Sequence, residues 1–531
     1  MIPDQPTKLA WRPIAVLAGV PGLLILDNSL GGVATPAILQ SLKSDINGVQ
    51  GVFTLSAVVI AACLLTAGKL GDVIGRRRAL LLGLSIRVLG SALAAAAPNL
   101  LLFGLGEAVI ESIGGAIAAT AAAALIADKF VGDQRARAFS IVGGASASAM
   151  ALGPLVGGWV ISAISWRAVF AFEAVAAFVL FLLSIFWVKN SQQIRSSARL
   201  DYLGAILSGV GLVLLVLGMQ LAAHSGRWFP YRNALSWWGL SPVIFIIAAG
   251  VAVLGMFVWW QVYANRTGRP VLVDAALVQL APLRATFLTG LAGQTAAVGM
   301  FFIYPVFLIL VLGHSPQMVG LLLAPAAVTA FTASMVWPRL ARRWSPRRVA
   351  RLGAVSLVGA GLAAFVEVSP GIASIPIAVS AALLGCGIGL LGAQLPATAQ
   401  GLVENRHRSE TAGLFSAAQN LGAAMGFVFL GSVFVIALSS GVRQFVAAEQ
   451  SLSEKTRAVA EVLVEQGVSF ITADQAREQL IAHGVPLSDI DSAVEAYKKS
   501  QHHALATGSV LIMGLGVVTW LLARRMPSKV S

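Results

Sequence analysis

Charge is scarce in this sequence. Of its 531 residues, 11% are charged and 57% are hydrophobic, whereas a soluble domain carries about 25% charged residues. This shortage excludes a water-soluble globule. The formal net charge of +14 does not indicate a nucleic-acid partner here, because the basic residues of membrane proteins anchor the loops on one side.

Cysteine and nucleotide-binding or nucleophile motifs are also scarce. Cys63 and Cys386 both lie in apolar runs, so we expect neither a disulfide framework nor a metal site. No G-x-x-x-x-G-K-[ST] segment is present for ATP hydrolysis, and no G-x-S-x-G nucleophile turn is evident. "GIGLLG" at 387–392 matches G-x-G-x-x-G, but it lies in an apolar run with no preceding strand. We therefore expect no enzyme activity and no cofactor.

The sequence consists instead of long apolar runs. About 20 helical residues span the ~30 Å hydrocarbon core, and helix is the only form in which segments this long can cross it. We predict an all-α integral membrane protein. About fourteen transmembrane helices are expected, at residues 13–38, 50–69, 79–97, 100–127, 138–164, 167–188, 202–222, 242–262, 286–312, 317–338, 349–367, 373–400, 412–439 and 504–523.

Lys and Arg fall mostly in alternate loops. With the N-terminus inside, the short outer loops hold only Lys43, Arg167, Arg227 and Arg232. Because Lys and Arg accumulate on cytoplasmic loops, we expect both termini in the cytoplasm and the chain in the cell inner (cytoplasmic) membrane. The N-terminus lacks a signal-peptide cleavage pattern, so the first span is expected to be retained.

A polar insertion at residues 441–503 separates the last two spans, on the expected outer face. Its apolar residues recur every three or four positions, and Ser488 with Asp491 has capping-box spacing. We predict two or three short amphipathic helices. The insertion is either a solvated, packed cap or an element that gates the protein or docks a partner.

The turn "GKLGDVIGRRR", residues 68–78, can latch two helix bundles together in one conformational state. Its glycines permit tight turns, its acidic residue can pair with Arg or bond a helix N-terminus, and its basic residues lie at the inner surface. A degenerate copy of this pattern of a span, a short basic turn and a span, "PRLARRWSPRRVARL", occurs at 338–352. Repeated halves suit a transporter that rocks about a central site. The gating residues expected here are Gly68, Gly71, Asp72, Gly75, Arg76 and Arg77.

These motifs resemble the major facilitator superfamily. The turn at 68–78 is similar to its loop signature, "GPLVGG" at 153–158 to its antiporter signature, and "LDNSLGGVATPAI" at 26–38 to the first-span motif of its fourteen-span drug:proton antiporter branch. The resemblance implies a major facilitator fold of six, two and six helices. The corresponding units are an N-terminal bundle at 12–188, two inserted helices at 202–262, and a C-terminal bundle at 285–524 that includes the 441–503 loop.

The antiporter-like segment is rich in helix-weakening residues. Gly153 and Gly157 lie one helical turn apart, which lets another backbone approach closely, and Pro154 frees the carbonyl of Met150 and favours a bend. With Gly158, they predict a close-packed, kinked seam between bundles. The resemblance implies that this seam gates the protein against proton leak; the alternative is a plain packing helix.

Five charged residues within spans carry the chemistry that we expect: Asp27, Arg87, Glu107, Glu111 and Glu173. Burying an ionised group costs several kcal/mol unless it faces a cavity or a partner. At 1.5 Å per residue, all four carboxylates can converge at similar depth in the outer half of the bilayer, with the two span-four glutamates on one face.

Such carboxylates can exchange protons, because burial and like-charge crowding favour the protonated form. A proton and a cationic substrate would compete for them, while Arg87 could hold one ionised; a purely structural ion pair with Arg87 accounts for only one or two of the four. The sequence departs from the family where Ala108 stands near an expected Arg, Glu111 at an expected Gln and Glu173 at an expected Asn. Coupling is therefore expected to rest on the N-terminal half.

The C-terminal half offers aromatic and amide side chains for a roomy pocket. Lipid-facing or packing roles are the alternative for its aromatics. The candidate residues are Gln294, Phe301, Phe302, Tyr304, Gln394, Gln419 and Asn420.

Together these features predict a monomeric, proton-coupled antiporter that exports hydrophobic or cationic compounds, as in multidrug efflux and antibiotic resistance. Its partners would be a small-molecule substrate, protons and the lipid bilayer, with the proton gradient as its energy source. A proton-coupled exporter of one dedicated substrate (a lipid, metabolite or self-made antibiotic) is the alternative. A membrane receptor or intramembrane enzyme is a further one.

Overall fold

The computed structural model describes residues 11–528 apart from 45, 131–132, 190–200, 226–240, 273–276, 278, 311, 313, 315, 342–343, 368–374, 405–406, 450–451 and 466–472. Within these ranges the regular secondary structure is helical, without strands. Nine helices in this part of the chain are long and apolar enough to cross a membrane, or ten if the bent helix at 51–74 counts as one span. The fold is therefore an all-helical membrane bundle, and the total of fourteen spans stays a prediction.

The first half of the bundle comprises the helices up to residue 187. These are α1 (Trp11–Leu42), α2 (Ile46–Ile74), α3 (Arg76–Ala96), α4 (Leu100–Gly104), the π-helix η1 (Leu105–Glu111), α5 (Ser112–Lys129), α6 (Asp133–Ala163) and α7 (Trp166–Trp187). The segments α4, η1 and α5 follow one another without a break and form one span.

Two helices follow, and then the second half. The inserted pair is α8 (Tyr202–Ser225) and α9 (Pro242–Arg266). The second half comprises α11 (Ala281–Leu310), α12 (Pro316–Ala341), α13 (Pro346–Glu367), α14 (Ile375–Gly401), α15 (Arg408–Met425), the π-helix η3 (Gly426–Leu430), α16 (Gly431–Ala448), α17 (Glu454–Glu465), α18 (Ala473–Ala482) and α19 (Leu487–Ala523).

Local sequence sets several of the helix boundaries. Gly75, with φ 99°, separates α2 from α3 in a conformation that favours glycine. Asn99 and Ser165 act as N-caps, accepting hydrogen bonds from the backbone N–H groups of Leu102 (3.0 Å) and Ala168 (3.3 Å). Gly75, Asn99 and Ser165 therefore lie in short turns between consecutive helices.

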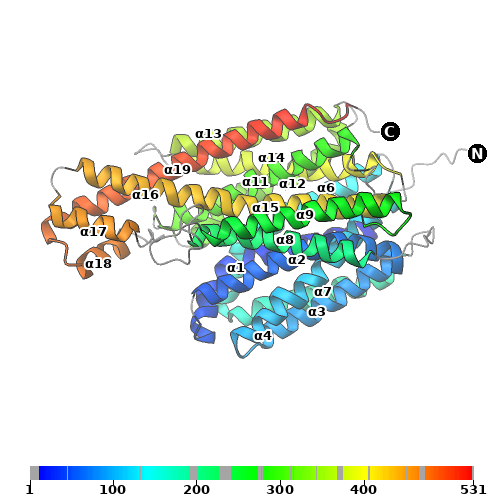
Figure 1. Cartoon of the computed structure of the whole chain (residues 1–531), viewed down its shortest axis with the longest axis horizontal. Helices are drawn as coiled ribbons and strands as arrows, with labels where there is room; N and C mark the ends of the chain where they lie inside the picture. The colour runs from blue at the N-terminus through cyan, green and yellow to red at the C-terminus, as the bar shows by residue number, and fades with distance from the viewer. Residues whose placement is uncertain are drawn as a thin grey trace, which may run out of the picture.

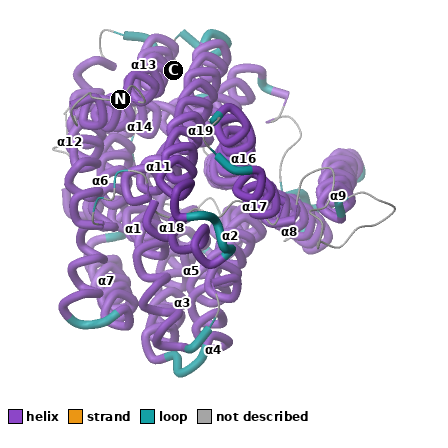
Figure 2. The backbone as a smooth tube through the Cα atoms, turned by 90° about the vertical axis from the view of Figure 1, so that its left-hand side faces the viewer, coloured by secondary structure: helices purple, strands orange, loops and turns teal. Residues whose placement is uncertain are grey.

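Figure 1 shows the two chain ends at one end of the bundle, here called the termini end, and α17 and α18 at the opposite, far end. The two halves meet along α6, which packs against α12 and α14, and along α2, which packs against α15. A Cβ atom at Gly143 of α6 would lie 3.2 Å from the backbone nitrogen of Ala393 in α14. The α8 helix packs on α2, and Figure 2 shows α8 and α9 at the side of the bundle.

The polar insertion forms a small helical unit at the far end. Leu480 of α18 and Ile490 of α19 belong to one apolar core that continues into the second half. The sequence predicts a last span at 504–523, but α19 is one continuous helix of 37 residues that begins at Leu487. Ser488 accordingly lies inside α19 and is not its N-cap, because Pro486 occupies that position. The insertion is thus a direct extension of α16 and α19.

Candidate functional site

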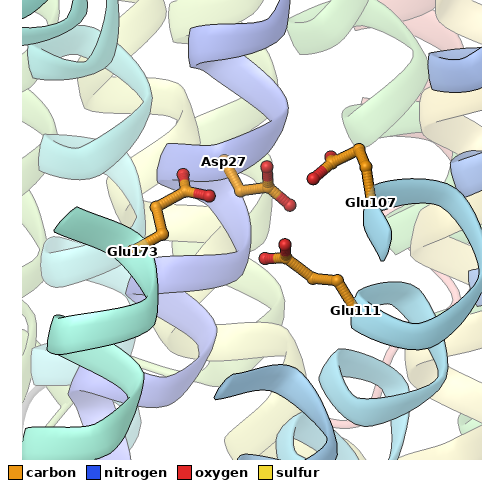
Figure 3. Close-up of side chains that lie close together, drawn as sticks. All are labelled: Asp27, Glu107, Glu111 and Glu173. Atoms are coloured by element: carbon orange, nitrogen blue, oxygen red, sulfur yellow. The ribbon is translucent and has the colours of Figure 1, made fainter. Parts of the chain in front are cut away.

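The structure brings the four intraspan carboxylates together. Asp27 comes from α1, Glu107 and Glu111 from η1, and Glu173 from α7, and their side chains point toward one another (Figure 3). Each offers a carboxylate oxygen, and these oxygens all lie within 4.8 Å of one another. The exposed fractions are 5% for Asp27, 2% for Glu107, 1% for Glu111 and 0% for Glu173. We call these four residues the carboxylate cluster.

Arg87 of α3 supplies a positive charge to the cluster. Its Nη2 lies 2.5 Å from Oε1 of Glu111 and 3.4 Å from Oδ2 of Asp27, and its side chain is 2% exposed. Among the described residues, Oε2 of Glu107 and both carboxylate oxygens of Glu173 have no hydrogen-bond partner. One guanidinium thus faces four acidic groups, so an ion pair explains only part of the cluster.

Close packing between α3 and the η1–α5 span positions Arg87 beside Glu111. A Cβ atom at Gly90 would lie 2.7 Å from Cα of Glu111, and one at Gly114 would lie 3.0 Å from Cα of Arg87. Real Cβ atoms do not approach backbone this closely, so both positions require glycine. The two helices can therefore bring an arginine and a glutamate into contact inside the bundle.

The segment that carries Glu107 and Glu111 is a π-helix, whereas their spacing predicts one face of an α-helix. The Ser112 hydroxyl donates to the carbonyl of Glu107 at 3.3 Å and lies 2.7 Å from the hydroxyl of Ser56 on α2. Single π-helical turns inside α-helices occur frequently at functional sites. The backbone irregularity here coincides with two members of the cluster.

The predicted turn between α2 and α3 forms contacts at the termini end. Arg76 pairs with Asp72 at 3.4 Å and also with Asp128 at the end of α5. Arg77 donates to the backbone carbonyls of Val188 (2.6 Å) and Ile185 (2.8 Å) at the end of α7. All these contacts lie within the first half. Gly68, Gly71 and Gly75 are buried in the same region.

A contact between the halves lies next to this turn. Arg408, at the start of α15, donates from Nη1 to the backbone carbonyl of Ala127 in α5 at 2.8 Å. Ala127 is adjacent to Asp128, which pairs with Arg76. Arg408 is not among the residues predicted to gate the protein, and its only signal in the sequence is its place among the basic residues expected at the inner surface.

The glycine motif in α6 faces its own half. A Cβ atom at Gly153 would meet the Ser29 side chain of α1, and one at Gly157 would meet Leu30 of α1. Two other glycines of α6 contact the second half instead: Gly143 meets α14, and Gly144 meets α12. Gly158 is half-buried, and the side chain of Pro154 lies outside the described residues.

The second-half candidates lie in different environments. Tyr304 is 1% exposed and packs in the apolar core, with Phe301 against it. Gln394 is buried and donates to the Thr398 hydroxyl at 2.5 Å within α14. Asn420 donates to the carbonyl of Ser416 at 2.9 Å. Gln294 and Gln419 are half-buried, and the Phe302 side chain lies outside the described residues.

One buried polar network was not predicted from the sequence. Asp201, just before α8, accepts hydrogen bonds from Trp260 (3.0 Å) and Gln261 (2.7 Å) of α9, and Gln261 accepts one from the backbone of Leu272 at 2.9 Å. The sequence signals this network only weakly, by a single Asp just before one span and polar residues near the end of the next. The network ties the two inserted helices to the segment that leads into the second half.

Comparisons with known proteins agree with this architecture. The family model described as Major Facilitator Superfamily matches residues 17–273 and 202–427. The multidrug efflux pump LfrA of Mycolicibacterium smegmatis is 28% identical over 98% of this chain and 97% of its own length. The puromycin resistance protein pur8 of Streptomyces alboniger is 27% identical over 81% of this chain and 82% of its own. The human organic anion transporter MFSD10 shares the fold, with a TM-score of 0.60 over 98% of this chain and 100% of its own at 14% identity.

Proposed function

Because the chain belongs to the Major Facilitator Superfamily and is a membrane transporter rather than an enzyme, we propose that it is a proton-coupled antiporter that exports hydrophobic or cationic compounds. The proton gradient supplies the energy, and no cofactor takes part. The names of two relatives, a multidrug efflux pump and a puromycin resistance protein, support multidrug efflux and antibiotic resistance as the physiological role.

The observation that carries this proposal is the carboxylate cluster around Arg87. Four acidic groups within 4.8 Å of one another and one guanidinium cannot all be ionised inside a bundle without a large cost. The cluster therefore holds protons, or a cation takes their place. Competition between the two for the same oxygens links proton entry to release of a cationic substrate.

Alternating access supplies the other half of the mechanism. The two halves rock about a central site, and the contact between Arg408 and Ala127 holds them together at the termini end. We assign the termini end to the cytoplasm of a cell whose inner membrane holds the protein as a monomer. In this state the substrate site faces outward, where protonation releases the substrate; proton loss to the cytoplasm then resets the site.

The test uses proteoliposomes of known orientation. An imposed proton gradient should drive ethidium uphill through the native protein, and Asp27→Asn should abolish this coupled flux. Asp491→Asn is the matched control, because Asp491 lies in the far-end unit and pairs only with the exposed Arg477 among the contacts described. Flux that persists unchanged in Asp27→Asn would refute the role of the cluster, and absence of dye movement by the native protein would favour a dedicated substrate.

A further inference from the structure

Two apolar layers enclose the carboxylate cluster within the first half. Toward the far end lie Phe103, Trp166 and Phe170, which pack edge to face with ring centroids 5.2 to 5.9 Å apart. Phe103 precedes Glu107 by one helical turn, and Phe170 precedes Glu173 by one turn. This layer separates the carboxylates from the water at the far end.

The second layer lies toward the termini end. It consists of buried side chains such as Leu17 of α1, Leu84 of α3 and Ala118 of α5. Leu84 precedes Arg87 by one turn of α3, so the layer begins directly beside the cluster. Among the described side chains, apolar layers thus lie on both sides of the carboxylate cluster.

A third side of the carboxylate cluster is the face that meets the second half. Leu24, one turn before Asp27 on α1, belongs to an apolar cluster against which Ala417 of α15 packs. Asp27 is also the most exposed member of the carboxylate cluster, at 5%, whereas Glu173 is fully buried. Asp27 therefore lies one helical turn from a contact between the halves, although all four carboxylates are buried.

The charge balance shows how many protons the cluster needs. Arg87 neutralises one carboxylate, which leaves three acidic groups without a counter-ion among the described residues. No other charged side chain that the structure describes comes as close to the cluster. Crowded carboxyl oxygens that have no donor are satisfied when some of the groups are protonated, since a protonated carboxyl group donates a hydrogen bond to its neighbour.

We propose that the carboxylate cluster stores more than one exchangeable proton, with Asp27 as its port to the central site and Glu107 and Glu173 as internal acceptors. The inference rests on the proposed function, since it describes how the protons of the proposed antiport are held and moved. A cation at Asp27 expels the proton held there, and the other acids then lose or gain protons through Asp27. More than one proton can accordingly move for each substrate.

Infrared difference spectroscopy on the purified full-length protein tests the store without any transport. As the pH rises from about 6, where ordinary exposed carboxyl groups are already ionised, the carbonyl band of protonated carboxylic acids should fall by an amplitude of more than one group per protein. Glu173→Gln should remove about one third of this loss, because three groups share it. Glu478→Gln, on the exposed face of α18, is the control and should leave it unchanged. Glu173→Asp, which keeps an acid, should restore the lost amplitude if the glutamine variant folds poorly.

A single-group amplitude, or one that Glu173→Gln does not alter in a folded protein, would overturn the proposal. The proton-to-ethidium ratio, measured from the gradients at which net flux stops in proteoliposomes, should exceed one and fall in Glu173→Gln. A ratio of one in the native protein would refute the store while leaving antiport intact. Absence of gradient-driven flux beside a multiple-group infrared loss would refute the proposed function and leave the store standing.

Discussion

Replacing Gly90 by alanine should disrupt the carboxylate cluster, because the added methyl group would clash with Glu111. A Cβ atom there would lie 2.7 Å from Cα of Glu111 and 2.8 Å from its Cβ, whereas carbon atoms in contact are ~3.5–4.0 Å apart. Because the obstructing atoms include backbone, α3 and η1 have to separate by about 1 Å. The ion pair between Arg87 and Glu111, 2.5 Å long in this structure, would lengthen by a similar amount.

Overpacking of this kind costs about 1–3 kcal/mol, and ~1.4 kcal/mol on a rate-limiting barrier slows a step about tenfold. Gly90→Ala should therefore unfold at lower temperature in detergent and reduce gradient-driven dye flux by about tenfold. Gly51→Ala is the control, since a Cβ there meets nothing within 4 Å. If the two variants show the same thermal stability and flux, close packing at Gly90 does not position the site.

Three further changes test other parts of the structure. Phe103→Ala removes a buried ring next to Glu107, so it should destabilise the protein by about 3–5 kcal/mol and raise the proton leak of vesicles without substrate; an unchanged leak would contradict the sealing role of the far-end layer. Arg408→Gln removes the charged donor to Ala127, so a cysteine introduced beside this contact should react faster with a water-soluble maleimide, and an unaltered rate would mean that this contact does not hold the halves together. Hydrogen bonds from Ser453 hold the pKa of Asp489 well below its ordinary value. Its stabilising effect is present above the unfolded pKa of about 3.9 and is lost as the pH falls through the lower folded value; the native protein should lose thermal stability below about pH 4 more steeply than Asp489→Asn, and parallel curves would refute this.

The convergence of the carboxylates was accessible from the sequence because helices crossing a bilayer have a fixed rise per residue. Counting residues from the predicted ends of the spans placed Asp27, Glu107, Glu111 and Glu173 at similar depth. The same reasoning named Arg87 as their partner, because a buried cation in the same bundle half needs an acid. Depth is a local property of each span, so the sequence contains it.

Other features depend on contacts between helices, which no single span encodes. Gly90 is one glycine among 54, and nothing in its neighbours marks it as the one that meets Glu111. The π-helix at η1 likewise follows from packing, since the residues from 105 to 111 also suit an α-helix. The continuity of α19 was missed because a polar stretch and an apolar stretch were assigned to separate elements, although helix persists through both.

Proton release on substrate binding tests the central claim most directly. Ethidium is added to the detergent-purified protein in unbuffered solution, binding is followed by fluorescence, and released protons are measured with a pH indicator. The account predicts that protons leave in proportion to the bound dye, and that Asp27→Asn reduces the release at equal occupancy while Asp491→Asn does not. Saturable dye binding with no release of protons by the native protein would contradict competition at the carboxylate cluster.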